Sequence, residues 1–133
     1  MRGSPIALMA TARQSDKGLQ AEQLVAVVDA GRLVNPAIAR QQVEGGLIFG
    51  LAAAVGATTD YEGGVATARR LGQLGLPRLS QTPQILVEFI ESDREPGGLG
   101  EIGVPVVAPA IANAMFAATG RRIRRLPLSA HPL

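Results

Sequence analysis

Glu101 is the residue of this sequence whose surroundings most suggest chemistry. Residues 96–105 read PGGLGEIGVP, with four glycines and two prolines around this one acid, and an apolar segment follows. Glycine adopts conformations that other residues avoid, and proline fixes φ and removes an N–H donor, so the segment predicts a shaped loop. We interpret Glu101 as a catalytic base held at the tip of this loop. A tight loop with a solvated acid is the alternative, which the spacing alone favours.

The environment of this carboxylate is left open by the sequence. Leu99, Ile102 and Val104 would desolvate the side chain and make it a better base near neutral pH, because burial disfavours the charged form. The N-terminus of the following helix acts in the opposite direction, since it stabilises an anion. The backbone amides of Gly98 and Gly100 are further groups that could point at an anion or an oxo group.

Gln42 is a second polar residue with unusual neighbours. The Asn-Pro pair at residues 35–36 is a strong helix start, because Asn is a favoured N-cap and proline suits the first helical position. The helix is predicted over residues 36–55, and it places Gln42, Gly45 and Phe49 on one face. This face predicts a buried amide beside a groove without side chains. A core glutamine bonded to nearby backbone is the alternative.

The same helix contains glycines that weaken it and an apolar second half. Gly45, Gly46 and Gly50 each cost roughly 1 kcal/mol relative to alanine. Close packing of another backbone or of a ligand is the simplest compensation. After Glu44 the helix is apolar on all sides, which predicts that it is buried.

Two main strands and a second helix complete the expected framework. The continuous β-branched run at residues 23–30 predicts a strand covered on both faces, and residues 84–91 predict another with one apolar face. Pro109 is comfortable only in a first turn, so the second helix is expected over residues 106–119, with Gly120 as its stop. Minor strands are expected at residues 6–12, 58–59 and 65–67, turns at 15–18 and 61–64, and a loop at 69–80.

Composition limits the remaining choices. The chain has 133 residues, of which 47% are hydrophobic, with one His, no Cys and a formal charge of +2. These values predict a single α+β domain over residues 1–133, with a small mixed sheet packed against two main helices. The lack of Cys excludes a thiolate zinc site, an iron–sulfur cluster and a disulfide in this chain. The single His, His131, is two residues from the C-terminus, so a His-based metal site or a Ser-His-Asp triad is not expected in this chain. No apolar run is long enough to span a bilayer.

Residues 121–125, with the sequence RRIRR, form the main cluster of charge. A solvated basic patch at the end of a helix is the favoured interpretation, and phosphate binding or subunit docking is the alternative. No aromatic residues interleave the arginines, so a nucleic-acid partner is not expected. Asp29 and the acids at residues 88–95 are interpreted as surface or strand-end charges.

Five blocks of sequence carry a family resemblance. They are VDAGRLVNP at residues 28–36, QVEGG at 42–46, PGGLGEIGVP at 96–105, APAIAN at 108–113 and ATGRR at 118–122. In this order they resemble the C-terminal part of the molybdopterin-binding subunit of the molybdenum hydroxylases, which is the xanthine dehydrogenase and aldehyde oxidase family. The bacterial aldehyde dehydrogenase and isoquinoline oxidoreductase type is the most similar. The resemblance covers nearly the whole chain and is loosest at residues 56–82.

The resemblance implies an oxidoreductase that hydroxylates aldehydes or N-heterocycles with oxygen from water. Glu101 would be the catalytic base that removes a proton from the water-derived hydroxyl. Gln42 would hydrogen-bond a molybdenum–molybdopterin cofactor, expected in the cytosine dinucleotide form. Gly98, Leu99 and Gly100 would supply backbone around the metal.

The resemblance also implies partners. The family's molybdopterin-binding subunit is several times longer, so we expect a C-terminal fragment or split subunit that shares its cofactor with the remainder and is inactive without it. Electrons would leave through an iron–sulfur subunit. A cytoplasmic location is expected, or a periplasmic one through a partner, and the isolated chain is expected to self-associate. A non-catalytic fragment that only binds or assembles is the alternative, and a stand-alone acid–base enzyme is the weakest option.

Overall fold

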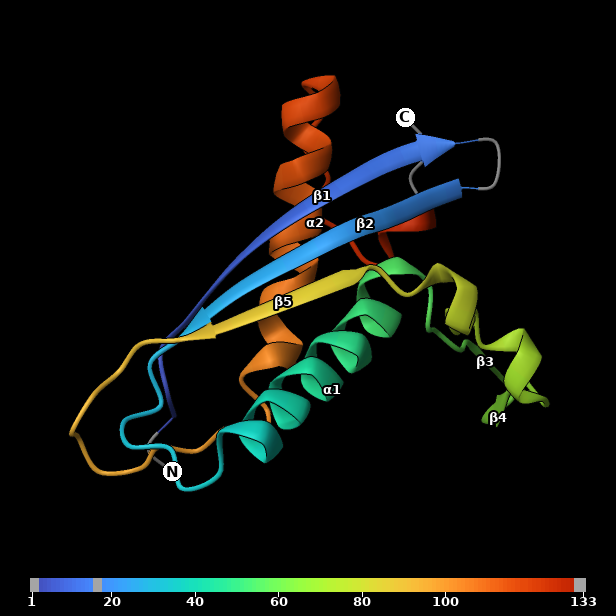
Figure 1. Ribbon diagram of the computed structural model, residues 1–133. Coiled ribbons are helices and arrows are strands. Elements are labelled where there is room, and N and C mark those ends of the chain that lie inside the picture. Colours follow the sequence, from blue (N-terminus) through green and yellow to red (C-terminus); the bar gives the residue numbers. More distant parts are fainter. Residues whose placement is uncertain (1–2, 16–17, 131–133) are drawn as a thin grey trace.

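A three-stranded mixed sheet forms the centre of the fold (Figure 1). A computed structural model describes residues 3–15 and 18–130 of the chain. In the order β1-β2-β5, strand β1 (Ile6–Ser15) pairs antiparallel with β2 (Gly18–Val28), and β2 pairs parallel with β5 (Gln84–Phe89). The strands expected at residues 23–30 and 84–91 are therefore present, and β1 is longer than predicted. His131 and the two central residues of the turn predicted at residues 15–18 lie outside the described residues.

Two helices pack against one face of this sheet. Helix α1 (Pro36–Val55) has the predicted bounds, and the side chain of Asn35 caps it by accepting a hydrogen bond from the Ile38 amide at 3.1 Å. Helix α2 (Gly103–Thr119) packs on β1 and on α1. Buried residues of the sheet and of both helices form one core, which includes Leu24, Ala26, Val28, Val43, Leu47, Leu51, Val87, Val107, Ile111 and Met115. The α+β architecture with a small mixed sheet and two main helices is confirmed.

The start of α2 corrects the sequence prediction. The helix begins at Gly103 and not near residue 106, so Pro109 lies inside it. Proline at this position leaves the carbonyl one turn earlier without its usual N–H partner. The buried contacts that Gly103 and Val107 make with α1 compensate for that loss. Gly120 ends the helix in the left-handed conformation, with φ of 71°, as predicted.

Close backbone contact between α1 and α2 explains two of the glycines in α1. A Cβ atom on Gly50 would lie 2.5 Å from the Val104 carbonyl oxygen, and one on Gly46 would lie 3.4 Å from the Cα of Gly103. Gly103 is equally restricted, because its Cβ would lie 2.9 Å from the Leu47 nitrogen. The predicted compensation by another backbone is therefore confirmed for Gly46 and Gly50. Gly45 differs, since nothing lies within 4 Å of the position its Cβ would take.

The opposite face of the sheet is uncovered in the described chain. Met9 is 71% exposed, Leu86 is 42% exposed and Val27 is 39% exposed. Strand register places Met9 opposite Val25 and Val25 opposite Leu86, so Met9, Val25 and Leu86 form a row across the three strands, and Val27 lies two residues further along β2. The strand at residues 23–30 was predicted to be covered on both faces. This prediction is wrong for the described residues, because both helices lie on the same side of the sheet.

Residues 56–83 form the less regular part of the fold. A two-stranded hairpin joins β3 (Tyr61–Glu62) and β4 (Val65–Ala66) through Gly63 and Gly64, both with positive φ. The expected strand at residues 58–59 is absent from the described structure. The predicted loop at residues 69–80 contains short 3-10 turns at Leu71–Gln73 and Leu79–Gln81. Among the described residues, neither helix has the length and apolar character needed to cross a bilayer.

Candidate functional site

The two loops that follow the parallel strands lie together at one edge of the sheet (Figure 1). They are joined by backbone hydrogen bonds, from the Gly97 amide to the Ala30 carbonyl at 2.8 Å and from the Arg32 amide to the Arg94 carbonyl at 2.9 Å. Parallel strands direct their carboxyl ends to the same edge, and ligands commonly bind in the crevice outside such ends. The loop that contains Glu101 is therefore one wall of a site formed by two loops.

An ion pair fastens these loops. The guanidinium of Arg94 contacts the carboxylate of Asp29, which also accepts a hydrogen bond from the Gly31 amide at 3.2 Å. The hydrogen bond from Arg94, with a smaller effect of the one from Gly31, lowers the pKa of Asp29 below its ordinary value. The sequence predicted only a surface or strand-end charge for Asp29. The signal for the ion pair is an acid at the end of one parallel strand and an arginine shortly after the other.

Small residues allow the loops to approach each other. Gly31 has φ of 69°, and a Cβ there would collide with backbone oxygens of Arg94 and Glu95. A Cβ on Gly97 would collide with the hydroxyl of Ser4. That Ser4 hydroxyl is buried and has no hydrogen-bond partner in the described chain. An unsatisfied buried hydroxyl is costly, so the loop region holds a polar group that is available to a ligand or an ordered water.

Gln42 and the glycine loop meet at a hollow of about 300 Å³. The Gln42 side-chain nitrogen donates a hydrogen bond to the Gly100 carbonyl oxygen at 3.4 Å. The hollow lies between the start of α1 and the loop before α2. Its walls are Ala30, Arg32, Leu33, Val34, Asn35, Ile38, Ala39, Gln42, Pro96, Gly97 and Leu99. The structure thus brings together two sequence blocks that were identified separately.

The surface of α1 around Gln42 is open, which corrects the prediction of a buried amide. Gln42 is exposed, and Phe49 on the same face is 69% exposed. Ile48 is 41% exposed, so the second half of α1 is not buried on all sides. Gly45, between Gln42 and Phe49 on this face, borders open space, because no atom lies within 4 Å of its Cβ position. The predicted face therefore exists, but the described residues do not cover it.

Glu101 lies at the tip of its loop and immediately before α2. Its backbone carbonyl accepts a hydrogen bond from the Val104 amide at 3.1 Å, and its side chain is exposed. Leu99 and Ile102 pack against the core, so they do not desolvate this carboxylate. Gly98 and Gly100 on the same loop are exposed as well. Any desolvation of Glu101 has to come from atoms other than the described ones.

The donors at this edge fit an organic polar cofactor better than a bare metal ion. They comprise the Gln42 amide, the unpaired Ser4 hydroxyl and exposed loop backbone. Among the described residues, no three His, Cys, Asp or Glu side chains gather in a way that could hold a metal ion. The fold and this hollow together define a small α+β domain with a candidate binding site between its two loops and the start of α1.

Comparison with known proteins identifies the cofactor class. A family described as the molybdopterin cofactor-binding domain matches residues 17–83. The chain is 39% identical over 107 residues to a membrane-bound aldehyde dehydrogenase [pyrroloquinoline-quinone] of Gluconacetobacter polyoxogenes, covering 80% of this chain and 14% of that protein. It is 34% identical over 115 residues to isoquinoline 1-oxidoreductase subunit beta of Brevundimonas diminuta, covering 86% of this chain and 15% of that protein.

A solved structure supports the same assignment. The crystal structure of the aldehyde oxidoreductase from Desulfovibrio desulfuricans is 30% identical, with a TM-score of 0.71, and the match covers 82% of this chain and 12% of that one. The chain belongs to the molybdopterin cofactor-binding domain family of the molybdenum hydroxylases. It spans about 14 to 15% of the length of the two curated relatives described above. The resemblance deduced from the five sequence blocks is confirmed.

Proposed function

We propose that this chain supplies the catalytic base and part of the cofactor pocket of a molybdenum-cofactor oxidoreductase. The reaction would hydroxylate aldehydes or N-heterocycles with oxygen derived from water. The observation that carries the proposal is the hydrogen bond between Gln42 and Gly100, which joins the two blocks expected at the cofactor. The family membership and the names of the relatives support the reaction class.

Gln42 and the glycine loop would hold the cofactor. Gln42 is exposed and its weak bond to Gly100 leaves one N–H and the amide oxygen available, so it can hydrogen-bond a polar heterocycle. The same group would contact the backbone of Gly98, Leu99 and Gly100. No atom lies within 4 Å of the position that a Cβ on Gly100 would take. That open space gives a bound molecule access to the loop backbone.

Glu101 would act as the base. Its exposed carboxylate lies one residue beyond Gly100, so a cofactor bound beside Gly100 would lie near it. A positioned carboxylate that accepts a proton from a water-derived hydroxyl contributes typically about 10²- to 10⁴-fold to a rate. When bound, the molybdenum cofactor would supply the two-electron redox chemistry. Exclusion of water around Glu101 would require the rest of the subunit, because the described residues leave the side chain open.

The finer assignments form part of the same proposal. The cofactor would be the cytosine dinucleotide form, shared with the remainder of the molybdopterin-binding subunit. An iron–sulfur subunit would accept the electrons, which accords with the absence of Cys from this chain. The chain would form one domain over residues 1–133, inactive alone, in an enzyme located in the cytoplasm or carried to the periplasm by a partner.

Co-expression with the rest of a molybdenum-binding subunit tests the proposal. The expected result is a stable complex that retains molybdenum and oxidises an aldehyde or an N-heterocycle. Glu101→Gln in that complex should retain the metal and reduce kcat by about 10²-fold or more. Turnover that survives this substitution would remove Glu101 from the role of base. A complex without molybdenum would instead support a fragment that only assembles.

A further inference from the structure

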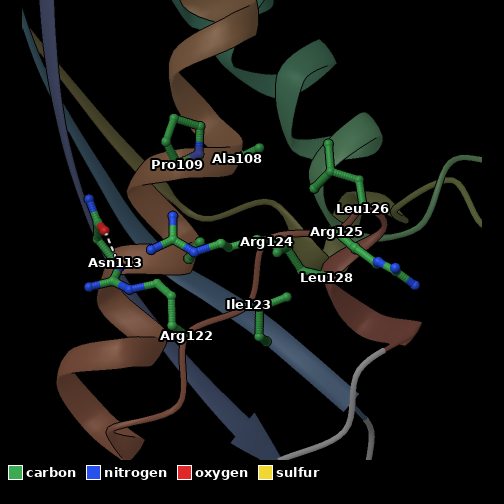
Figure 2. A pocket seen from close by; sticks show the side chains of 10 residues that line it. Ala108, Pro109, Asn113, Arg122, Ile123, Arg124, Arg125, Leu126 and Leu128 are labelled. Carbon is green, nitrogen blue, oxygen red and sulfur yellow. Dashed lines mark hydrogen bonds between the residues drawn. The ribbon is translucent and has the colours of Figure 1, made fainter.

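A second hollow lies beside the middle of α2, and neither Gln42 nor Glu101 lines it. The segment at residues 121–125 folds back over this helix and forms a hollow of about 320 Å³ (Figure 2). The lining residues are Ala108, Pro109, Ala112, Asn113, Arg122, Ile123, Arg124, Arg125, Leu126 and Leu128. Asn113 is ten residues beyond the start of α2, which corresponds to about 15 Å along the helix axis.

Arg122 is held in place by two contacts with α2. Its guanidinium donates a hydrogen bond to the side-chain oxygen of Asn113 at 2.6 Å, and it lies 3.7 Å from the centroid of the Phe116 ring. An exposed arginine normally loses conformational entropy when it binds an anion. The contacts with Asn113 and Phe116 reduce that cost. The guanidinium also retains N–H donors that Asn113 does not use.

Arg124 shares this hollow and has no hydrogen-bond or ion-pair partner among the residues that the structure describes. Figure 2 shows the side chains of Arg122 and Arg124 both turned toward α2, while Arg125 is turned away. Within the part of the chain that the structure describes, no hydrogen bond or ion pair of Arg124 is found. No Asp or Glu occurs anywhere from residue 102 to residue 130. Two guanidinium groups thus share one hollow without a carboxylate to neutralise them.

Stabilisation of the helix end does not account for this arrangement. Cations favour the last turn of a helix, where the carbonyl groups carry partial negative charge. Arg124 lines the hollow together with Ala108 and Pro109, which belong to the first half of α2.

We infer that this hollow binds a phosphate group, attached to a small molecule with an apolar or planar body. Two planar guanidinium forks can share the oxygens of one phosphate, and arginine is the residue best suited to such contacts. Ala108, Pro109, Ala112 and Ile123 form an apolar floor beside them. The volume lies at the small end of the range for ligand pockets. This site is separate from the proposed cofactor contacts, and the inference does not depend on the proposed function.

Titration of the whole isotope-labelled chain, followed by amide NMR, tests the inference. The probes are inorganic phosphate, cytidine monophosphate, cytidine and a hexaglutamate peptide, at low salt. We expect both phosphates to shift the amides of Ala112, Asn113 and Ile123 in a saturable manner, and cytidine to leave them unchanged. Tighter binding of the nucleotide than of phosphate would support a phosphate ester as the ligand, and equal binding would overturn the ester assignment, because the apolar floor would then add nothing.

Substitutions give the decisive comparison. Arg124→Gln should weaken phosphate binding about tenfold, because a charge-assisted bond is lost. Arg69→Gln is the matched control, since Arg69 is exposed and does not line the hollow. This variant should bind phosphate as tightly as the parent does. If Arg124→Gln does not fold, Arg124→Lys keeps the charge without the fork and should still bind measurably more weakly. Equal affinity in the Arg124 variants, equal loss in Arg69→Gln, or hexaglutamate binding as tight as phosphate would overturn the inference.

Discussion

The side chain of Gln42 donates a hydrogen bond to the carbonyl oxygen of Gly100 across 3.4 Å, although 58 residues separate them in the sequence. Gln42 lies in the second turn of α1, and Gly100 lies in the loop just before α2. The crossing of these helices, with the backbones of Gly46 and Gly103 in contact, brings the two residues together. A long hydrogen bond on the exposed surface contributes little to the free energy of folding. We therefore expect Gln42 to affect cofactor binding more than stability.

Gln42→Leu separates these two roles. The free energy of unfolding of the isolated chain should change by no more than about 0.5 kcal/mol, because the residue is exposed. In the co-expressed complex the variant should retain several-fold less molybdenum, measured per mole of protein. Gln41→Leu, at an exposed neighbouring position of α1, should retain as much metal as the parent. Equal metal content in the two variants would remove Gln42 from the cofactor site.

Two glycines of α1 should respond to alanine in opposite directions. Gly50→Ala should lower the free energy of unfolding by about 1 to 3 kcal/mol, because its Cβ would lie 2.5 Å from the Val104 carbonyl oxygen. Gly45→Ala should raise it by about 0.5 to 1 kcal/mol, since alanine favours a helix and the position faces open space. Urea unfolding of both variants measures the difference. A stable Gly50→Ala protein would contradict the helix crossing described above.

The Asp29–Arg94 pair should make stability depend on pH in the acid range. The folded chain lowers the pKa of Asp29, so its contribution is present above the pKa of a free aspartate, about 3.9, and is lost as the pH falls through the lower folded value. Thermal unfolding between pH 7 and pH 3 should show a steeper acid loss in the parent than in Asp29→Asn. Asp93→Asn, an exposed acid in the loop after β5, should follow the parent. Parallel curves for parent and Asp29→Asn would refute this role.

The uncovered apolar surfaces should cause the isolated chain to associate. Phe49 is 69% exposed on α1 and Met9 is 71% exposed on the open face of the sheet. Replacing both with Lys should lower the mass measured by light scattering toward that of a monomer, because contiguous exposed apolar patches promote association. Tyr61→Lys is the control, since this residue is 70% exposed on the β3–β4 hairpin. A parent chain that is monomeric at all concentrations would contradict the prediction.

Much of the site was predictable from local rules. Asn35 and Pro36 fixed the start of α1, and the glycines around Glu101 marked a loop, because both signals act through the conformation of their own residues. The family blocks predicted Gln42 and Gly98–Gly100 as a set, and the structure brings Gln42 and Gly100 into contact. The start of α2 is predicted too late, because local rules include the cost of Pro109 inside a helix. They do not include the contacts that Gly103 makes with α1.

The sequence by itself determined the main strands, the bounds of α1, the mixed architecture and the family, because these follow from local propensity, hydrophobic periodicity and ordered motifs. Only the tertiary structure decided which apolar surfaces are covered, since periodicity shows that a face is apolar but not which element packs on it. It also decided that Asp29 meets Arg94 and that Arg122 and Arg124 share one hollow. These arrangements depend on how separate segments pack in the folded chain, so local sequence patterns do not predict them.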